Sequence, residues 1–159
     1  MTAHLDVQPS RIALALNLEL SHGRPGASAR VEIHDPGTGT RAAGSGRIAR
    51  VALRGCIDAI AARRLREALD DLALHGVEQV LVDCEELRHV DFRLVPELIA
   101  ILERFEARSG GVMVCGLSRY LRDLFRLAGC ESRLRCWPSA AELLETSAVT
   151  PEPGRECAS

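Results

Sequence analysis

The first part of the chain alternates apolar residues with smaller or polar ones. In the segment 11–20, Ile12 and four leucines occupy every second position, which is the period of a strand with one buried face. The segment 21–28 is rich in Gly and Pro and predicts a turn, after which Val31 and Ile33 indicate a second strand. We therefore expect a β-hairpin at the amino terminus.

A loop and then an alternation of strands and helices follow the hairpin. The run DPGTGTRAAGSG at 35–46 has the composition of a flexible loop. Short apolar runs predict strands, whereas apolar residues spaced three and four apart predict helices. Strands are expected at 48–53, 77–82 and 112–114, and helices around 65–72, 95–105 and 121–128. Ser139 and Glu142 have the spacing of a capping box and predict a fourth, short helix.

This order of elements predicts an α/β fold with a mixed or largely parallel sheet. Residues 1–46 form the hairpin and loop, which we expect to belong to the same sheet or to pack on it. Residues 47–147 form the main domain, and the tail at 148–159 is expected to be disordered because it is rich in Pro and polar residues.

Composition narrows the possible functions. A chain of 159 residues is long enough for one domain with a real core. Aromatic residues make up only 3% and the net charge is -2, so neither stacking platforms nor a strong field favours binding to nucleic acid. No stretch approaches the ~20 apolar residues that span a bilayer. We expect a cytoplasmic protein without membrane insertion.

The cysteines and histidines do not form a metal-binding pattern. The six cysteines are spread singly without a CxxC pair, which favours reduced, buried thiols over a disulfide framework or a zinc site. The five histidines include no pair at the i, i+4 spacing of a helical metal site. No metal and no cofactor are therefore predicted.

Six short motifs occur in a fixed order over roughly the last two thirds of the chain. They are Gly55-Cys56-Ile57-Asp58, Val80-Leu81-Val82-Asp83-Cys84, Val90-Asp91, Val112-Met113-Val114-Cys115-Gly116, Leu124 to Gly129, and Trp137-Pro138-Ser139. Their order and spacing, from about residue 47 to 144, resemble the STAS domain family, named from sulfate transporters and anti-sigma factor antagonists. The resemblance implies a STAS-like mixed sheet flanked by about four helices, with the hairpin as an extension, and a role in binding proteins without catalysis.

The chain departs from this family at the loop after Asp91. In partner-switching antagonists the corresponding Asp precedes a Ser that a cognate anti-sigma kinase phosphorylates, but here Phe92, Arg93 and Leu94 follow. Phe has no hydroxyl to accept a phosphate and does not imitate the charge of phosphoserine. Because Pro96 fits best in a first helical turn, the next helix is expected to begin near 93–95.

The residues singled out near this loop also have structural interpretations. Asp91 is either a partner contact or a helix cap, and Asp58 has the same two interpretations, with the cap slightly favoured. Phe92 is either an exposed anchor for another protein or part of the core, and the core is favoured.

Charged clusters elsewhere have simpler explanations. Arg119, Arg122 and Arg126 are spaced as one stripe of a helix, which favours a solvated face over an anion site. Four acidic residues near one strand end suggest a distant alternative, a hydrolase, but no nucleophile motif, phosphate loop or metal spacing accompanies them. These acidic residues are Asp83, Glu85, Glu86 and Asp91.

The leading hypothesis is a regulatory module, not an enzyme, that resembles an anti-sigma factor antagonist and is not phosphorylated at the usual position. Its partner would be an anti-sigma factor or kinase, or another STAS protein. The predicted partner-binding residues are Asp58, Asp91, Phe92, Arg93 and Leu94. The alternative is a structural STAS subunit of a signalling scaffold or transport complex. A homo-oligomer is also compatible with the sequence.

Overall fold

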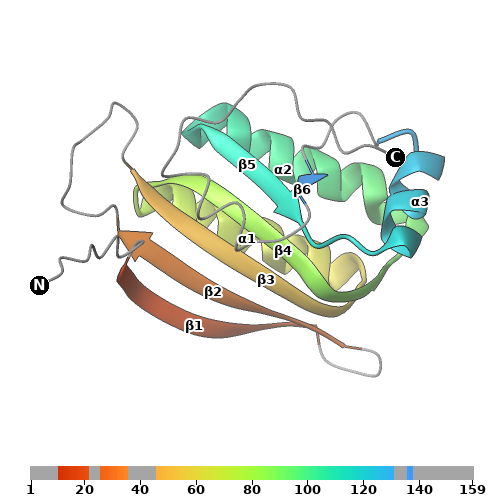
Figure 1. The fold of residues 1–159 in the computed structure, drawn as a ribbon, viewed down its shortest axis with the longest axis horizontal. Helices are drawn as coiled ribbons and strands as arrows, with labels where there is room; N and C mark the ends of the chain where they lie inside the picture. Colours follow the sequence, from red (N-terminus) through yellow and green to blue (C-terminus); the bar gives the residue numbers. More distant parts are fainter. Residues whose placement is uncertain (1–10, 22–25, 36–45, 131–135, 138–159) are drawn as a thin grey trace, which may run out of the picture.

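The computed structural model describes residues 11–21, 26–35, 46–130 and 136–137. These residues form one mixed sheet with helices on one of its faces (Figure 1). The strands follow the order β1-β2-β3-β4-β5-β6, which is also their order in the sequence. Their bounds are β1 Arg11–Ser21, β2 Ala27–Asp35, β3 Arg47–Ile57, β4 Val77–Val90, β5 Gly111–Cys115 and β6 Cys136–Trp137.

The amino-terminal hairpin is a continuous part of this sheet. Strands β1 and β2 pair antiparallel, and β2 pairs antiparallel with β3 along eight residue pairs from Ala27↔Gly55 to His34↔Ile48. From β3 onward the pairing is parallel. Parallel neighbours require crossover connections, and the helices between the strands supply them.

Helices α1 (Ala59–Leu74) and α2 (Val95–Ser109) lie behind the sheet in Figure 1, and α3 (Arg119–Leu127) lies beyond the end of β5. A one-turn 3-10 helix, η1 (Phe92–Leu94), precedes α2. The core lies between the sheet and α1 and α2. Alternate strand residues such as Val31, Val51 and Val82 point into it and meet Leu65 and Ile99 of the two helices.

Glycines end the helices as the sequence predicts. Gly76 follows α1 with φ 81° and Gly129 follows α3 with φ 74°, and the left-handed region is one that glycine enters without the steric cost of a Cβ. Helix α2 begins at Val95 with Pro96 in its first turn, which confirms the expected start near 93–95. The described residues contain three α-helices. The predicted fourth helix, after Ser139, lies outside them.

Strand β4 is longer than expected. The apolar run predicted a strand over 77–82, but β4 continues to Val90. Its second half pairs with the end of β3, from Arg54↔Glu86 to Ile57↔Val90, after a register shift. This pairing with the end of β3 supplies the hydrogen bonds that a polar sequence such as Glu85-Glu86 does not predict. Leu87 and Val90 still reach the core.

Neither a metal-binding cluster nor a membrane-spanning helix is found among the described residues. Cys56, Cys84, Cys115 and Cys130 are not joined in disulfides, and the described residues contain no group of three or more acidic, His or Cys side chains arranged to hold a metal ion. Among these residues, no helix is both long enough and apolar enough to cross a bilayer.

Candidate partner-binding edge

The predicted site residues lie at the edge of the sheet where the parallel strands β3 and β4 end. The backbone N–H of Asp91, just after β4, donates to the carbonyl of Ile57 at the end of β3 (3.1 Å). Because Asp58 follows Ile57 and Phe92 follows Asp91, this one hydrogen bond brings the two predicted segments together. The helices α1, η1 and α3 all begin at this edge of the sheet. We call the surface formed by their first turns the carboxyl edge.

Asp58 is the N-cap of α1. It has extended backbone angles, and its Oδ1 accepts a hydrogen bond from the N–H of Ala61 (2.8 Å). The cap expected from the sequence is confirmed. The side chain satisfies one of the free N–H groups that open a helix, so its structural role is shown, while a contact with a partner stays a prediction.

Asp91 has the same kind of role in front of η1. Its Oδ1 accepts from the N–H of Arg93 (3.0 Å), and the Arg93 guanidinium lies 3.5 Å from Oδ2. These two interactions, the backbone hydrogen bond first, hold the pKa of the Asp91 carboxyl below its usual range. The carboxylate therefore stays charged and fixes the loop from Asp91 to Leu94.

The core interpretation of Phe92 is wrong. The residue is 46% exposed, because the 3-10 turn fixed by Asp91 directs Leu94, and not Phe92, toward the core. Leu94 is partly buried and packs against the core cluster. The Arg93 side chain is 87% exposed. Of the three loop residues after Asp91, the first two are therefore available on the surface.

Two exposed apolar residues at this edge were missed in the sequence. Ile60 in the first turn of α1 is 49% exposed, and Tyr120 in the first turn of α3 is 52% exposed. The Tyr120 hydroxyl shares a hydrogen bond with Nδ1 of His89 on β4 (2.7 Å), and the two rings stack. This bond ties α3 to the end of β4. The only sequence signal was that each residue precedes the periodic apolar positions of its helix.

Helix α3 begins with a cap and carries the arginine stripe. Ser118 Oγ accepts from the N–H of Leu121 (3.2 Å), as the sequence suggested. Arg119 and Arg126 are exposed, and Arg126 lies 3.7 Å from Asp123. Arg122, between them, is only partly exposed and its Nε is buried, so the solvated-face interpretation holds for the two outer arginines of the stripe.

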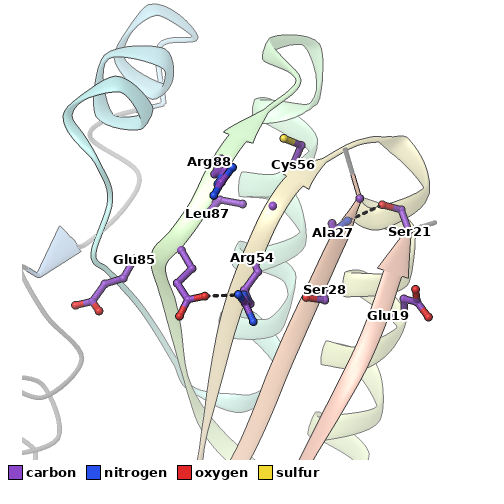
Figure 2. Close-up of a pocket in the computed structure, with 12 residues that line it drawn as sticks. Glu19, Ser21, Ala27, Ser28, Arg54, Cys56, Glu85, Leu87 and Arg88 are labelled. Carbon is purple, nitrogen blue, oxygen red and sulfur yellow. Dashed lines mark hydrogen bonds and ion pairs between the residues drawn. The ribbon is translucent and has the colours of Figure 1, made fainter. Parts of the chain in front are cut away.

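An open hollow of about 780 Å³ adjoins the carboxyl edge on the side of the sheet away from the helices (Figure 2). Strands β1 to β4 line it. Arg54 and Glu86 face one another across adjacent strands and form an ion pair of 2.5 Å. Close approach of two backbones shapes its floor, because the N–H of Cys56 donates to the carbonyl of Gly26 (3.1 Å). A Cβ on Gly55 would lie only 2.0 Å from that carbonyl oxygen.

The acidic residues considered for catalysis do not form one cluster. Asp83 and its acidic neighbours lie within β4 and not at its end, since the strand continues to Val90. Asp83 is buried and bonded to Arg50 (2.5 Å) and to the N–H of Glu85 (3.0 Å). Glu86 is paired with Arg54, and Asp91 caps η1. Each of these three carboxylates thus has a structural partner.

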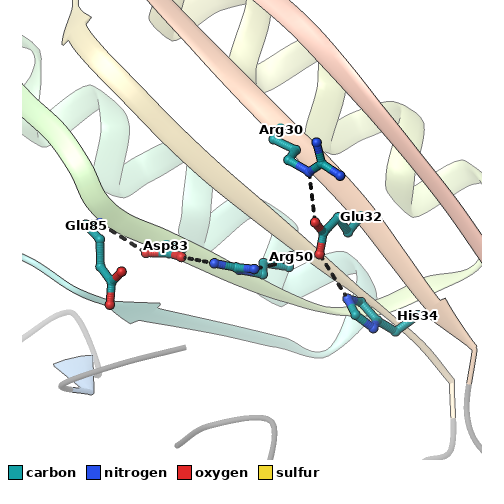
Figure 3. Close-up of polar contacts among 6 residues, drawn as sticks. All are labelled: Arg30, Glu32, His34, Arg50, Asp83 and Glu85. Carbon is teal, nitrogen blue, oxygen red and sulfur yellow. Dashed lines mark hydrogen bonds and ion pairs between the residues drawn. The ribbon is translucent and has the colours of Figure 1, made fainter. Parts of the chain in front are cut away.

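Asp83 belongs to a chain of charges across the face of the sheet that the described helices do not cover (Figure 3). Arg50 lies between Asp83 and Glu32, 3.7 Å from the latter, and Glu32 also accepts from Arg30 (2.9 Å) and lies 3.6 Å from His34. Burial raises the pKa of Glu32, but Arg30, Arg50 and His34 together outweigh it, so its pKa lies below the usual value. The network connects the side chains of β2, β3 and β4 on this face.

Comparisons with known proteins agree with this architecture. A family model described as "Mlab, STAS domain" matches residues 40–136. No curated protein sequence matches the chain well enough to count as a relative. An anti-sigma factor antagonist from Mycobacterium paratuberculosis has a similar solved structure, with a TM-score of 0.61, 19% identity and coverage of 81% of this chain and 98% of that one. The unphosphorylated anti-sigma factor antagonist SpoIIAA gives a TM-score of 0.53, 18% identity and coverage of 65% and 91%.

The match over residues 40–136 covers more than half of the chain. The chain therefore belongs to the STAS domain family. The two solved structures are less than 20% identical to this chain, so the likeness concerns the fold alone. The shared fold is the mixed sheet with helices on one face.

Proposed function

We propose that this chain is a regulatory protein-binding module of the anti-sigma factor antagonist type, acting in the cytoplasm of a bacterium on transcription and without catalysis of its own. Its partner, an anti-sigma factor or another STAS protein, binds at the carboxyl edge. The contact residues are Phe92 and Arg93, with Asp58, Asp91 and Leu94 holding them in place.

The exposure of Phe92 carries this proposal. An aromatic side chain left 46% exposed in the loop after Asp91 offers a large apolar area to a partner at low entropic cost, and aromatic and Arg residues dominate binding hot spots. Ile60 and Tyr120 add exposed apolar surface from the neighbouring helix starts. Three elements thus place half-exposed apolar residues at the same edge of the sheet. Such a group supports a binding interface better than a surface that only faces water.

The same loop supports binding that phosphorylation does not switch. The residues from Asp91 to Leu94 contain no hydroxyl, so a STAS-directed kinase with ATP should add no phosphate there. Ser118 is exposed but caps α3 through its hydroxyl. Mass spectrometry that found stoichiometric phosphate on Ser118, with loss of partner binding, would contradict a permanently competent module.

The proposal is tested by capturing partners from the source cell with the tagged chain and with a variant carrying Phe92→Ala and Arg93→Ala, which removes both side chains without adding a hydroxyl. We expect the captured partner to be lost from the variant, because a buried aromatic anchor contributes ~2 kcal/mol or more, over tenfold in affinity. The matched control is Leu74→Ser, which changes a 74% exposed residue at the far end of α1 and should leave capture unchanged.

The outcomes separate the functional alternatives. A kinase-like anti-sigma factor that depends on Phe92 supports the proposal. A large assembly that binds the double variant as well as the wild type would favour the structural-subunit alternative. Equal capture by wild type, double variant and control would place the interface away from the carboxyl edge.

A further inference from the structure

Strand β1 forms one border of the sheet. Among the described strands it is hydrogen-bonded to β2 only, and Figure 1 shows it at the outer margin, far from α2 and β5. The backbone groups on the free side of such a strand can pair with another strand. Among the described strands the opposite border is β6, which has only two residues, so β1 is the longer of the two described edges.

The regular part of β1 is short and uncharged at its centre. Irregularities between Ile12 and Leu14 and between Glu19 and Ser21 bracket six regular residues from Leu14 to Glu19, which is a typical strand length. Between Arg11 and Glu19 the sequence holds no charge. Leu14 is 49% exposed, and Leu16 and Leu18 are only partly buried.

We propose that β1 pairs antiparallel with β1 of a second copy of this chain, with Leu16 at the centre, so that two sheets join into one. A two-fold axis perpendicular to the sheet keeps the helices of both copies on the same side. In this register Leu16 faces its own counterpart and Leu14 faces Leu18 of the partner copy. On the other side of the sheet, Ala15 faces Asn17 of the partner copy.

The lack of charged residues in this part of β1 favours a second copy of the chain as the strand that pairs with it. Antiparallel pairing of two identical strands places like residues opposite or close to one another, and like charges directly opposite are destabilising. The window from Leu14 to Leu18 avoids this, and it gives leucine opposite leucine on the side of the core. The window ends at Glu19, whose carbonyl accepts a hydrogen bond from Arg64 of α1 (3.3 Å).

This surface is separate from the carboxyl edge, because the edge is built from the ends of β3 and β4 and the starts of three helices. Self-association through β1 therefore stands or falls independently of the proposed partner binding. It leaves Phe92 and Arg93 accessible on both copies.

The register is testable with Ala15 and Asn17, which are both exposed and stand opposite one another between copies. A variant with Ala15→Lys and Asn17→Lys places Lys against Lys twice, and a variant with Ala15→Glu and Asn17→Glu places Glu against Glu. In sedimentation equilibrium, the average mass of the wild type should rise with concentration from that of one chain, 17.3 kDa, toward twice that mass. The dimer of each variant should be weaker by a factor of about ten or more.

An equimolar mixture of the two variants should recover the association, because each Glu then faces a Lys. The control is Ala100→Lys with Ala107→Lys, which adds the same charge on the exposed side of α2 and should behave as the wild type. A wild type that stays at the mass of one chain up to millimolar concentration would overturn the proposal. So would a Lys variant that associates like the wild type, or a mixture that stays monomeric although circular dichroism shows folded proteins.

Discussion

The N–H of Asp91 donates to the carbonyl of Ile57 at 3.1 Å, across the ends of two parallel strands. This hydrogen bond couples two aspartates that each cap the following turn, Asp58 for α1 and Asp91 for η1. The loop with Phe92 is thus fixed by backbone and carboxylate contacts before any partner arrives. Preorganisation of this kind lowers the entropic cost of binding.

Replacing Phe92 should affect binding and not folding. Phe92→Ser removes an aromatic group that is already 46% exposed, so we expect the free energy of unfolding to change by less than about 1 kcal/mol. Phe105→Ala, at a residue 3% exposed in α2, should cost about 3 to 5 kcal/mol. Urea denaturation of both variants checks this. Comparable losses of unfolding free energy in the two variants would show that Phe92 is part of the core.

Removing the cap of α1 should give a moderate loss. Asp58→Ala leaves the N–H of Ala61 without its 2.8 Å acceptor and should lower the free energy of unfolding by about 1 kcal/mol. Asp58→Ser should restore most of it, because Ser also caps well. Asp71→Ala, at an exposed position of the same helix, serves as the control in thermal unfolding. An Asp58→Ala protein as stable as this control would show that the cap contributes nothing.

The pair of Arg50 and Asp83 should show strong coupling. Asp83→Leu leaves Arg50, whose side chain is 30% exposed, without its nearest carboxylate, and we expect a loss of roughly 2 kcal/mol, less than for a fully buried pair. The double variant Arg50→Met with Asp83→Leu should recover part of that loss, since apolar residues can replace a buried ion pair. A double-mutant cycle in urea measures the coupling. Losses that simply add would contradict the network.

Glu32 should contribute to the sensitivity of the fold to acid. Its pKa lies below the ordinary 4.5 in the folded protein, so its contribution to stability is full above pH 4.5 and is lost as the pH falls through the lowered value. The urea midpoint of the wild type should therefore fall more steeply below pH 4.5 than that of Glu32→Gln. Glu106→Gln, on the exposed side of α2, is the matched control. Parallel curves for Glu32→Gln and wild type would show that the network does not act on this carboxylate.

Much of the fold follows from local patterns. The alternating leucines of β1 and the glycines that end α1 and α3 correctly predicted where those elements lie, because period and left-handed glycine positions are properties of short segments. The second half of β4 was missed. Its sequence is polar, and it is a strand because the end of β3 lies beside it.

The sequence by itself determined the order of the strands and helices from β1 to α3 and the absence of a hydroxyl from Asp91 to Leu94, since each of these depends on residues close together in the chain. It offered caps as one interpretation of Asp58 and Asp91, and the structure showed both. Only the tertiary structure decided that Phe92 faces outward, that Ile60 and Tyr120 share its side of the sheet, and that Asp83 is buried against Arg50. These facts depend on which side of a turn the core lies and on which strands become neighbours. Contacts between distant residues settle both, and no local pattern contains them.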